Sequence, residues 1–167
     1  MDIDLKQLLR DSLERLDGIL ERVPEPVFHK RLAEDMFSLG MNARISANFS
    51  LRGYCPLVGQ AIPDFGSAGE SKAEIRKQLH DTLEYLASQP DVTTLDRAIQ
   101  LTDRAGLEDI TLPQPAFIHS YILPNVYFHL SMVYAIARLH GVPLGKGDFD
   151  GLHRYPAGFR FVPPSTS

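Results

Sequence analysis

The chain has 167 residues, of which 44% are hydrophobic and 23% are charged, and its formal net charge is −4. These values are typical of one soluble globular domain, and the acidic balance disfavours nucleic acid as a partner, because a nucleic-acid-binding surface is basic. No apolar run approaches the ~18 residues of a membrane span, no signal-peptide pattern is present, and the single cysteine, Cys55, excludes an intrachain disulfide. We therefore expect a cytoplasmic protein with neither a membrane nor a nucleic acid as its partner.

The first third of the chain contains two stretches with the spacing of an amphipathic helix. Residues 3–23 carry a leucine-rich stripe at helical spacing and end before Pro24. Residues 28–52 form the second predicted helix, with Gly53 as its terminator. Its apolar stripe consists of Phe28, Leu32, Met36, Leu39, Ala43 and Ala47. A long loop rich in Gly and Pro, residues 53–71, separates this helix from the next one.

The third predicted helix covers residues 71–88. Ser71 and Glu74 form the pattern of a capping box at its start, and Pro90 follows its end. Residues 93–106 have the spacing of a short helix that partly buries leucine and isoleucine side chains. Residues 108–119 contain β-prone residues and two prolines, which favours irregular or briefly extended structure.

The last long helix is predicted over residues 120–140. Pro124 suits its first turn, Gly141 suits a left-handed residue after its end, and Pro143 prevents its continuation. Four such helices predict an all-α fold, an antiparallel four-helix bundle with a long loop between the second and third helices and irregular segments before the last helix. We expect residues 1–152 to form this single domain and residues 153–167 to form an extended C-terminal tail.

The last helix carries two polar residues inside an apolar run. Asn125, His129, Met132 and Ile136 are spaced by four, three and four residues, so they share one helix face. Inward polar residues are how helical bundles build metal and ligand sites, and a buried imidazole needs a hydrogen-bond partner. Asn125 and His129 are therefore candidate catalytic residues. The alternative is a structural role, in which they bond to each other or to a neighbouring backbone.

Further residues are candidates for lining a ligand pocket around His129. On the second helix, a face with polar members includes Asn42 and is flanked by other polar side chains, and His119 precedes the last helix. The predicted ligand-binding residues are Asn42, Arg44, Asn48, His119, Tyr127 and Met132. Another histidine, His80, lies four residues from Glu84 in the third helix, on a face that we interpret as solvated and ion-paired.

Three stretches of the sequence resemble a known family. They are "RLAEDMFSL" in the second helix, "ITLP" after the third, and "LPNVYFH…YAIARLHGVPLGKGDF" at the end. The resemblance is to a domain-of-unknown-function family of small helical proteins within the DinB-like, YfiT-type superfamily, and it covers about residues 5–152. It implies an antiparallel four-helix bundle, often dimeric, so it allows a homodimer. Better-known members hold a divalent metal with three histidines, and some are thiol-dependent transferases or hydrolases.

The match to the metal-binding pattern is partial. His129 falls on the second histidine of the HxxxH motif of the last helix, whereas Asn125 stands where the first should be and the second helix has no histidine. One histidine with neutral amides is a poor site for zinc or nickel. We therefore expect no tightly bound metal and no other cofactor; if a divalent metal binds, His129 is its expected ligand.

Three functions stay open at this point. The first is a protein that binds a small molecule around His129, with His129 available as a general acid or base without metal. The second is a divalent-metal-dependent transferase or hydrolase of the DinB type. The third is a non-catalytic dimeric scaffold in which Asn125 and His129 only fix packing. Whether the protein is an enzyme, and what its ligand is, cannot be read from these residues.

Overall fold

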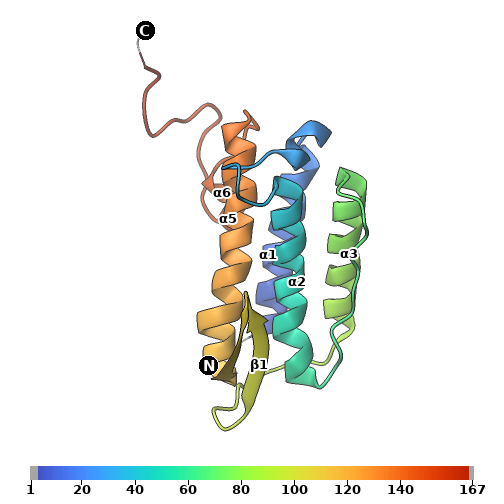
Figure 1. Ribbon diagram of the computed structural model, residues 1–167. Coiled ribbons are helices and arrows are strands. Elements are labelled where there is room, and N and C mark those ends of the chain that lie inside the picture. Colours follow the sequence, from blue (N-terminus) through green and yellow to red (C-terminus); the bar gives the residue numbers. More distant parts are fainter. Residues whose placement is uncertain (1–3, 166–167) are drawn as a thin grey trace.

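Four long helices pack side by side around a common apolar core (Figure 1). They are α1 (Leu5–Arg22), α2 (Leu39–Tyr54), α3 (Lys72–Ser88) and α5 (Leu123–Leu139). The computed structural model describes residues 4–165, so residue 3 of the first predicted helix lies outside the described residues. α1 and α5 run in one direction and α2 and α3 in the other (Figure 1). The protein is mostly helical. Its helices α2 and α3 are parallel to each other, whereas the prediction had all neighbouring helices antiparallel.

The parallel arrangement of α2 and α3 follows from the long connection between them. A short 3-10 helix, η2 (Cys55–Val58), continues α2 and ends at Gly59, which has the left-handed φ of 68°. The chain then returns along the length of α3 before that helix begins (Figure 1). The predicted capping box is confirmed, because Ser71 Oγ accepts from the backbone N–H of Glu74 and the Glu74 carboxylate accepts from the N–H of Ser71.

The prediction that the second helix begins at residue 28 is wrong. Residues Glu25–His29 form a 3-10 helix, η1, and α2 begins at Leu39 after its N-cap Ser38. Between them the chain makes an exposed loop closed by a bridge between Arg31 and Ser38 and by the hydrogen bond from Leu39 N–H to the Lys30 carbonyl (2.8 Å). The Ser38 hydroxyl accepts from the Met41 N–H and so caps α2 at this point.

The region predicted as a short helix over residues 93–106 instead contributes a strand, so the fold is not purely α-helical. Strands β1 (Gln100–Ala105) and β2 (Glu108–Pro113) form a two-stranded antiparallel sheet. Their connection contains Gly106, whose φ of 65° is the left-handed conformation that a two-residue hairpin turn requires. Thr102 and Thr111 pair across the strands through their hydroxyls (2.8 Å). The hairpin lies across the ends of α2 and α5 (Figure 1).

The last long helix is preceded by a continuous helical segment. A three-residue helix, α4 (Gln114–Ala116), leads into a π-helix, η3 (Phe117–Ile122), and then into α5. Pro124 has no N–H to donate, and its ring disfavours the normal α-helical hydrogen bond at this turn, which agrees with the wider π-helical geometry before it. Gly141 has the predicted left-handed φ of 80° and ends the helix.

A short helix, α6 (Lys146–Asp150), packs against α1 and α5, and residues 153–165 follow without a helix or strand. Within residues 4–165, no helix combines the length and the apolar composition that crossing a membrane requires.

Candidate functional site

His129 is buried between α5 and α2, and its partner is Asn42. The imidazole is 8% exposed, and its Nδ1 lies 2.8 Å from Oδ1 of Asn42. Asn42 itself is 2% exposed and stands in the first turn of α2. The two residues are 87 positions apart in the chain, so only the packing of α5 on α2 brings them together.

The other hydrogen bonds of Asn42 determine which ring nitrogen of His129 carries the proton. The Asn42 Nδ2 group donates to the carbonyl oxygens of Phe37 (3.1 Å) and Ser38 (2.9 Å). Its Oδ1 therefore faces His129 as an acceptor, and Nδ1 of the imidazole must be the donor. In the neutral ring this leaves Nε2 with a free lone pair. Within residues 4–165, Nε2 makes no hydrogen bond. It is not fully enclosed either, because the completely buried side-chain atoms without a partner belong to other residues.

Burial also favours the neutral form of this imidazole. Desolvation lowers the pKa of His129 below its ordinary value of 6.5, because the charged ring loses contact with water. At neutral pH the ring is therefore an uncharged base whose accepting nitrogen is Nε2. A neutral histidine oriented by an amide can accept a proton from a bound molecule.

Aromatic rings surround the imidazole on two sides. Phe49 of α2 stacks on it with a centroid distance of 5.9 Å and an interplanar angle of 18°. Phe128 meets it edge to face at 5.1 Å and 90°, and half of the Phe128 side chain is exposed. These two rings were not among the predicted site residues. Their apolar character is shared with many core positions, so the sequence carries no signal that separates them.

The predicted partner Asn125 does not bond to His129. Its Nδ2 donates to the Tyr121 carbonyl one turn earlier (2.7 Å), and the side chain is half-buried. Met132 is half-buried one turn after His129, on the same side of α5. Tyr127 is partly buried against the core, but two residues before His129 it points to a different face.

Three other predicted ligand-binding residues lie away from His129 or contribute elsewhere. The Arg44 guanidinium holds the α2–α3 loop through the carbonyls of Ser67 (3.0 Å) and Gly69 (2.7 Å). Asn48 accepts from Nε2 of Gln78 (2.9 Å) across α2 and α3. His119 is an exposed residue of η3. Arg44 and Asn48 thus make contacts with the α2–α3 loop and with α3, and the role of these side chains in ligand binding stays a prediction.

A polar cluster beside Phe49 was not predicted from the sequence. Arg52 lies with its guanidinium carbon 4.4 Å from the Phe49 ring centroid. It donates to Asp103 of β1 (2.8 Å), to the Arg104 carbonyl (2.7 Å) and to the Tyr121 hydroxyl (2.9 Å). These contacts fasten the hairpin to α2 and η3 and hold Phe49 in place beside His129.

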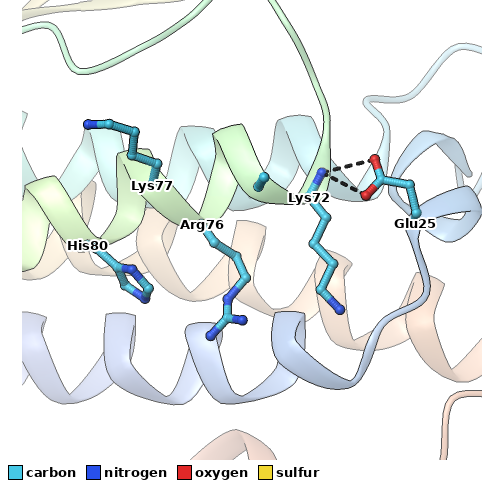
Figure 2. A pocket seen from close by; sticks show the side chains of 6 residues that line it. Glu25, Lys72, Arg76, Lys77 and His80 are labelled. Carbon is cyan, nitrogen blue, oxygen red and sulfur yellow. Dashed lines mark hydrogen bonds between the residues drawn. The ribbon is translucent and has the colours of Figure 1, made fainter.

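Two clefts in the described part of the chain, residues 4–165, are lined by residues other than His129. The larger of the two, about 480 Å³, is lined by Glu25 of η1 and by residues of α3 that include Lys72, Arg76, Lys77 and His80. Figure 2 shows that Lys72, Arg76 and His80 point toward α1 there, whereas Lys77 points away. The smaller, about 360 Å³, lies beside η2 and residues 90–94.

The side chains of this cleft that point toward α1 already have partners there. Arg76 donates twice to the Asp17 carboxylate (2.8 and 3.0 Å), and Nε2 of His80 is 2.9 Å from the same group. Burial alone raises the pKa of Asp17, but the hydrogen bonds from Arg76 and His80 outweigh it, and the pKa lies below 3.8. Lys72 Nζ donates to the Glu21 and Val23 carbonyls at the end of α1. This cleft is therefore a seam of structural ion pairs.

Comparison with known proteins places the chain in a family. Residues 5–150 match the family model of a domain of unknown function, DUF1993. The chain belongs to this family. The DUF1993 model spans the four long helices, α6 and the hairpin, and it ends before the tail.

The fold of this DUF1993 protein is similar to a solved DinB structure. A crystal structure of a DinB family member protein from Shewanella denitrificans matches with a TM-score of 0.76 and 25% sequence identity, over 92% of this chain and 94% of that chain. Curated proteins yielded no match. The predicted membership of a DinB-like family of unknown function is confirmed by these findings.

The residues at the metal positions of DinB-like proteins do not fit a tightly held metal in this chain. Within the described residues, no three His, Cys, Asp or Glu side chains lie close enough together to hold a metal ion. Nδ1 of His129 is taken by Asn42, an amide, and the amide of Asn125 bonds to its own helix. Zinc and nickel sites in proteins are built from several imidazole, thiolate or carboxylate donors.

Proposed function

We propose that this DinB-like protein binds a small molecule beside His129 and Phe128, at the solvent-facing edge of the contact between α2 and α5, which we call the α2–α5 seam. We propose further that His129 acts there as a general base. The observation that carries the proposal is the bonding of Asn42, which uses both amide hydrogens on backbone carbonyls and so offers only an acceptor to His129. The imidazole is thereby oriented with Nε2 as its one unused polar atom.

The chemistry that this arrangement supports is a proton transfer. A ligand O–H or N–H that donates to Nε2 gives up its proton as the Nε2–H bond forms, which leaves an anionic ligand and an imidazolium. The hydrogen bond from Nδ1–H to Asn42 Oδ1 (2.8 Å) strengthens when the ring becomes positive. The lowered pKa of His129 keeps the base unprotonated at neutral pH before the transfer.

Chemical modification tests whether a reagent reaches Nε2. Diethyl pyrocarbonate acylates an accessible neutral imidazole nitrogen, and peptide mass spectrometry locates the product. We expect His129 to be modified, and a fragment-library compound that binds the site to protect it. His140, which is exposed at the end of α5, should react with or without the compound. Complete modification of His140 with no reaction at His129 would contradict the proposal.

Binding itself is tested by following the imidazole resonances of His129 during a fragment screen by NMR. A compound that shifts the His129 Cε1–H signal in the unaltered protein should cause no chemical-shift changes at the α2–α5 seam in a His129→Ala variant. The matched control is His140→Ala, an exposed histidine at the end of α5. If the same compound binds equally well to the His129→Ala protein, the proposed role of His129 is wrong.

A second candidate function is that of a homodimeric scaffold. It is favoured by the composition of α5, which has no charged residue between positions 123 and 137, and by the exposure of Phe128 and Leu139 on this helix. Interface cores are depleted of charge and enriched in aromatic residues and Met. Sedimentation velocity of a Leu139→Glu variant tests it: a dimer that becomes a monomer supports the scaffold, and a monomeric unaltered protein excludes it.

A further inference from the structure

The surroundings of His129 narrow the chemical class of its ligand. Resting on the proposed function, we infer that the site takes a neutral aromatic molecule that carries an O–H or N–H donor. Three features beside His129 point to this class: the unused polar atoms are acceptors, the surrounding part of α5 carries no charge, and aromatic rings flank the imidazole.

The unused polar atoms at this edge are acceptors. Nε2 of His129 offers a lone pair, because its Nδ1–H is bonded to Asn42. Asn125 donates Nδ2 to the Tyr121 carbonyl, which leaves its Oδ1 without a hydrogen bond in the described part of the chain. The two residues are one turn apart on the same side of α5. The nearby hydroxyl of Ser46 is already used on the Val126 carbonyl (3.1 Å). A ligand therefore has to supply the donors.

The helix that carries His129 offers no charge to an ionic ligand. The segment of α5 from residue 123 to residue 137 contains no Asp, Glu, Lys or Arg. The cation beside Phe49 is Arg52, whose Nε and Nη2 donate to Asp103, Tyr121 and the Arg104 carbonyl, so its charge is balanced by the Asp103 carboxylate. His129 is kept neutral by burial, which lowers its pKa. A carboxylate, phosphate or ammonium group would lose its hydration at this edge without gaining a counter-ion.

The rings provide contact surface for another aromatic ring. Phe49 stacks on the imidazole and is 7% exposed, so it forms the floor of the site. Phe128 stands perpendicular to the imidazole and is 50% exposed, so a ligand can reach part of it from solvent. Aromatic pairs favour offset-stacked and edge-to-face arrangements. A ligand ring that packs on Phe128 therefore lies beside the imidazole of His129. Its O–H or N–H group can then donate to Nε2.

A panel of four benzene derivatives tests each part of this inference. Phenol has the ring and the donor, anisole has the ring without the donor, benzoate adds a negative charge and benzylamine a positive one. The readout is the titration of the Nε2 nitrogen-15 and Cε1–H resonances of His129 in the labelled protein. We expect phenol to bind with a dissociation constant about tenfold lower than that of anisole, because only phenol bonds to Nε2. Both ions should bind more weakly still.

Two variants locate the contact. Phe128→Ala should weaken phenol binding about fivefold, through loss of the aromatic pair. Leu107→Ala is the matched control, because Leu107 is an exposed apolar residue at the hairpin tip and should leave binding unchanged. Equal binding of phenol and anisole, tighter binding of either ion, or an unaffected Phe128→Ala protein would overturn the inference.

These outcomes are separable from failure of the proposed function. If diethyl pyrocarbonate modifies His129 and a library compound protects it, but phenol shifts no His129 resonance, the ligand class is wrong and the site stands. If the reagent does not reach His129 at all, both the site and its ligand class are wrong.

Discussion

The two antiparallel seams of this protein, α1–α3 and α2–α5, accommodate polar side chains in opposite ways. In the α1–α3 seam the polar groups are charged, partly exposed and fully paired, as in the cluster of Asp17, Arg76 and His80. In the α2–α5 seam they are neutral and buried, and the pair of Asn42 and His129 leaves one acceptor unused. The larger cleft lies along α3, beside the first seam, and the second seam has the unused atom.

This difference shows why cleft volume alone is a poor guide to function in a small helical protein. The cleft along α3 is lined by long polar side chains, and Lys72 and Arg76 among them already have partners on α1 (Figure 2). A ligand there would compete with existing ion pairs. At the α2–α5 edge a ligand would satisfy an acceptor that the fold leaves free, which is a gain without a matching loss.

The largest expected effect is in the buried pair. Asn42→Ala removes the acceptor of His129 Nδ1–H and the donors to the Phe37 and Ser38 carbonyls. We expect a loss of about 2–3 kcal/mol, because buried groups stay unpaired. The midpoint of thermal unfolding should fall by roughly 5–10 °C for a chain of this size. The control is Asn125→Ala, whose half-buried amide bonds only within α5 and should cost less than about 1 kcal/mol. Equal losses of stability in the two variants would show that the buried amide of Asn42 contributes no more than the half-buried amide of Asn125.

The second-largest expected effect on stability depends on how closely α2 packs against η3. A Cβ on Gly53 of α2 would lie 2.5 Å from Cγ2 of Ile122, whereas a Cβ on Gly18 of α1 would meet no atom within 4 Å. Gly53→Ala should therefore destabilise the protein by about 1–2 kcal/mol through overpacking. Gly18→Ala should stabilise it by about 0.5–1 kcal/mol, because alanine is the better helix former. Urea unfolding of both variants measures the two signs, and two changes of the same sign would show that the α2 side is no more tightly packed.

The ion-paired seam should be less sensitive. Asp17→Asn removes the carboxylate shared by Arg76 and His80, which are partly exposed, and we expect a loss of about 1 kcal/mol or less. The loss should shrink at high salt, since partly exposed pairs are screened. Asp81→Asn, which breaks an exposed pair with Lys77 in the same helix, is the control and should cost only about 0.3 kcal/mol. A salt-independent loss larger than that of Asn42→Ala would invert the comparison.

The smallest effect is the pH dependence of stability. Burial lowers the pKa of His129, so as the pH falls below about 6.5 the unfolded chain binds a proton that the folded chain resists. The contribution of the neutral His129 is thus fully present above that pH and declines as the pH falls toward the lowered pKa. Unfolding midpoints at pH 7.5 and 5.5 should differ less for His129→Gln than for the unaltered protein. Asp17 does not interfere, because its lowered pKa affects stability only below its ordinary value of 3.8.

Local signals in the sequence predicted α1, α3 and α5 well. The leucine stripe of α1, the capping box of Ser71 and Glu74, and the left-handed Gly141 are features of a few consecutive residues, and each is present in the structure. The two errors in the predicted helices are the start of the second helix and the short helix over residues 93–106. Both arose where apolar residues had helical spacing by coincidence. Leu32 has the spacing of a core residue but is 44% exposed in the loop before α2, and Leu101 lies in β1. Apolar periodicity does not report which residues find a partner surface.

The sequence by itself determined a mostly helical DinB-like protein, paired His129 with Asn125, and gave Asn42 as one of six further candidates around His129. Tertiary structure decided their chemistry: that Asn42 rather than Asn125 is the partner of His129, that Arg44 and Asn48 serve the α3 side, and that Phe49 and Phe128 enclose the imidazole. The physical reason is the range of the interactions. Helix caps and stripes act over one to five turns of the same helix, whereas the tautomer and pKa of a buried histidine depend on groups 87 residues away that only packing brings within 3 Å.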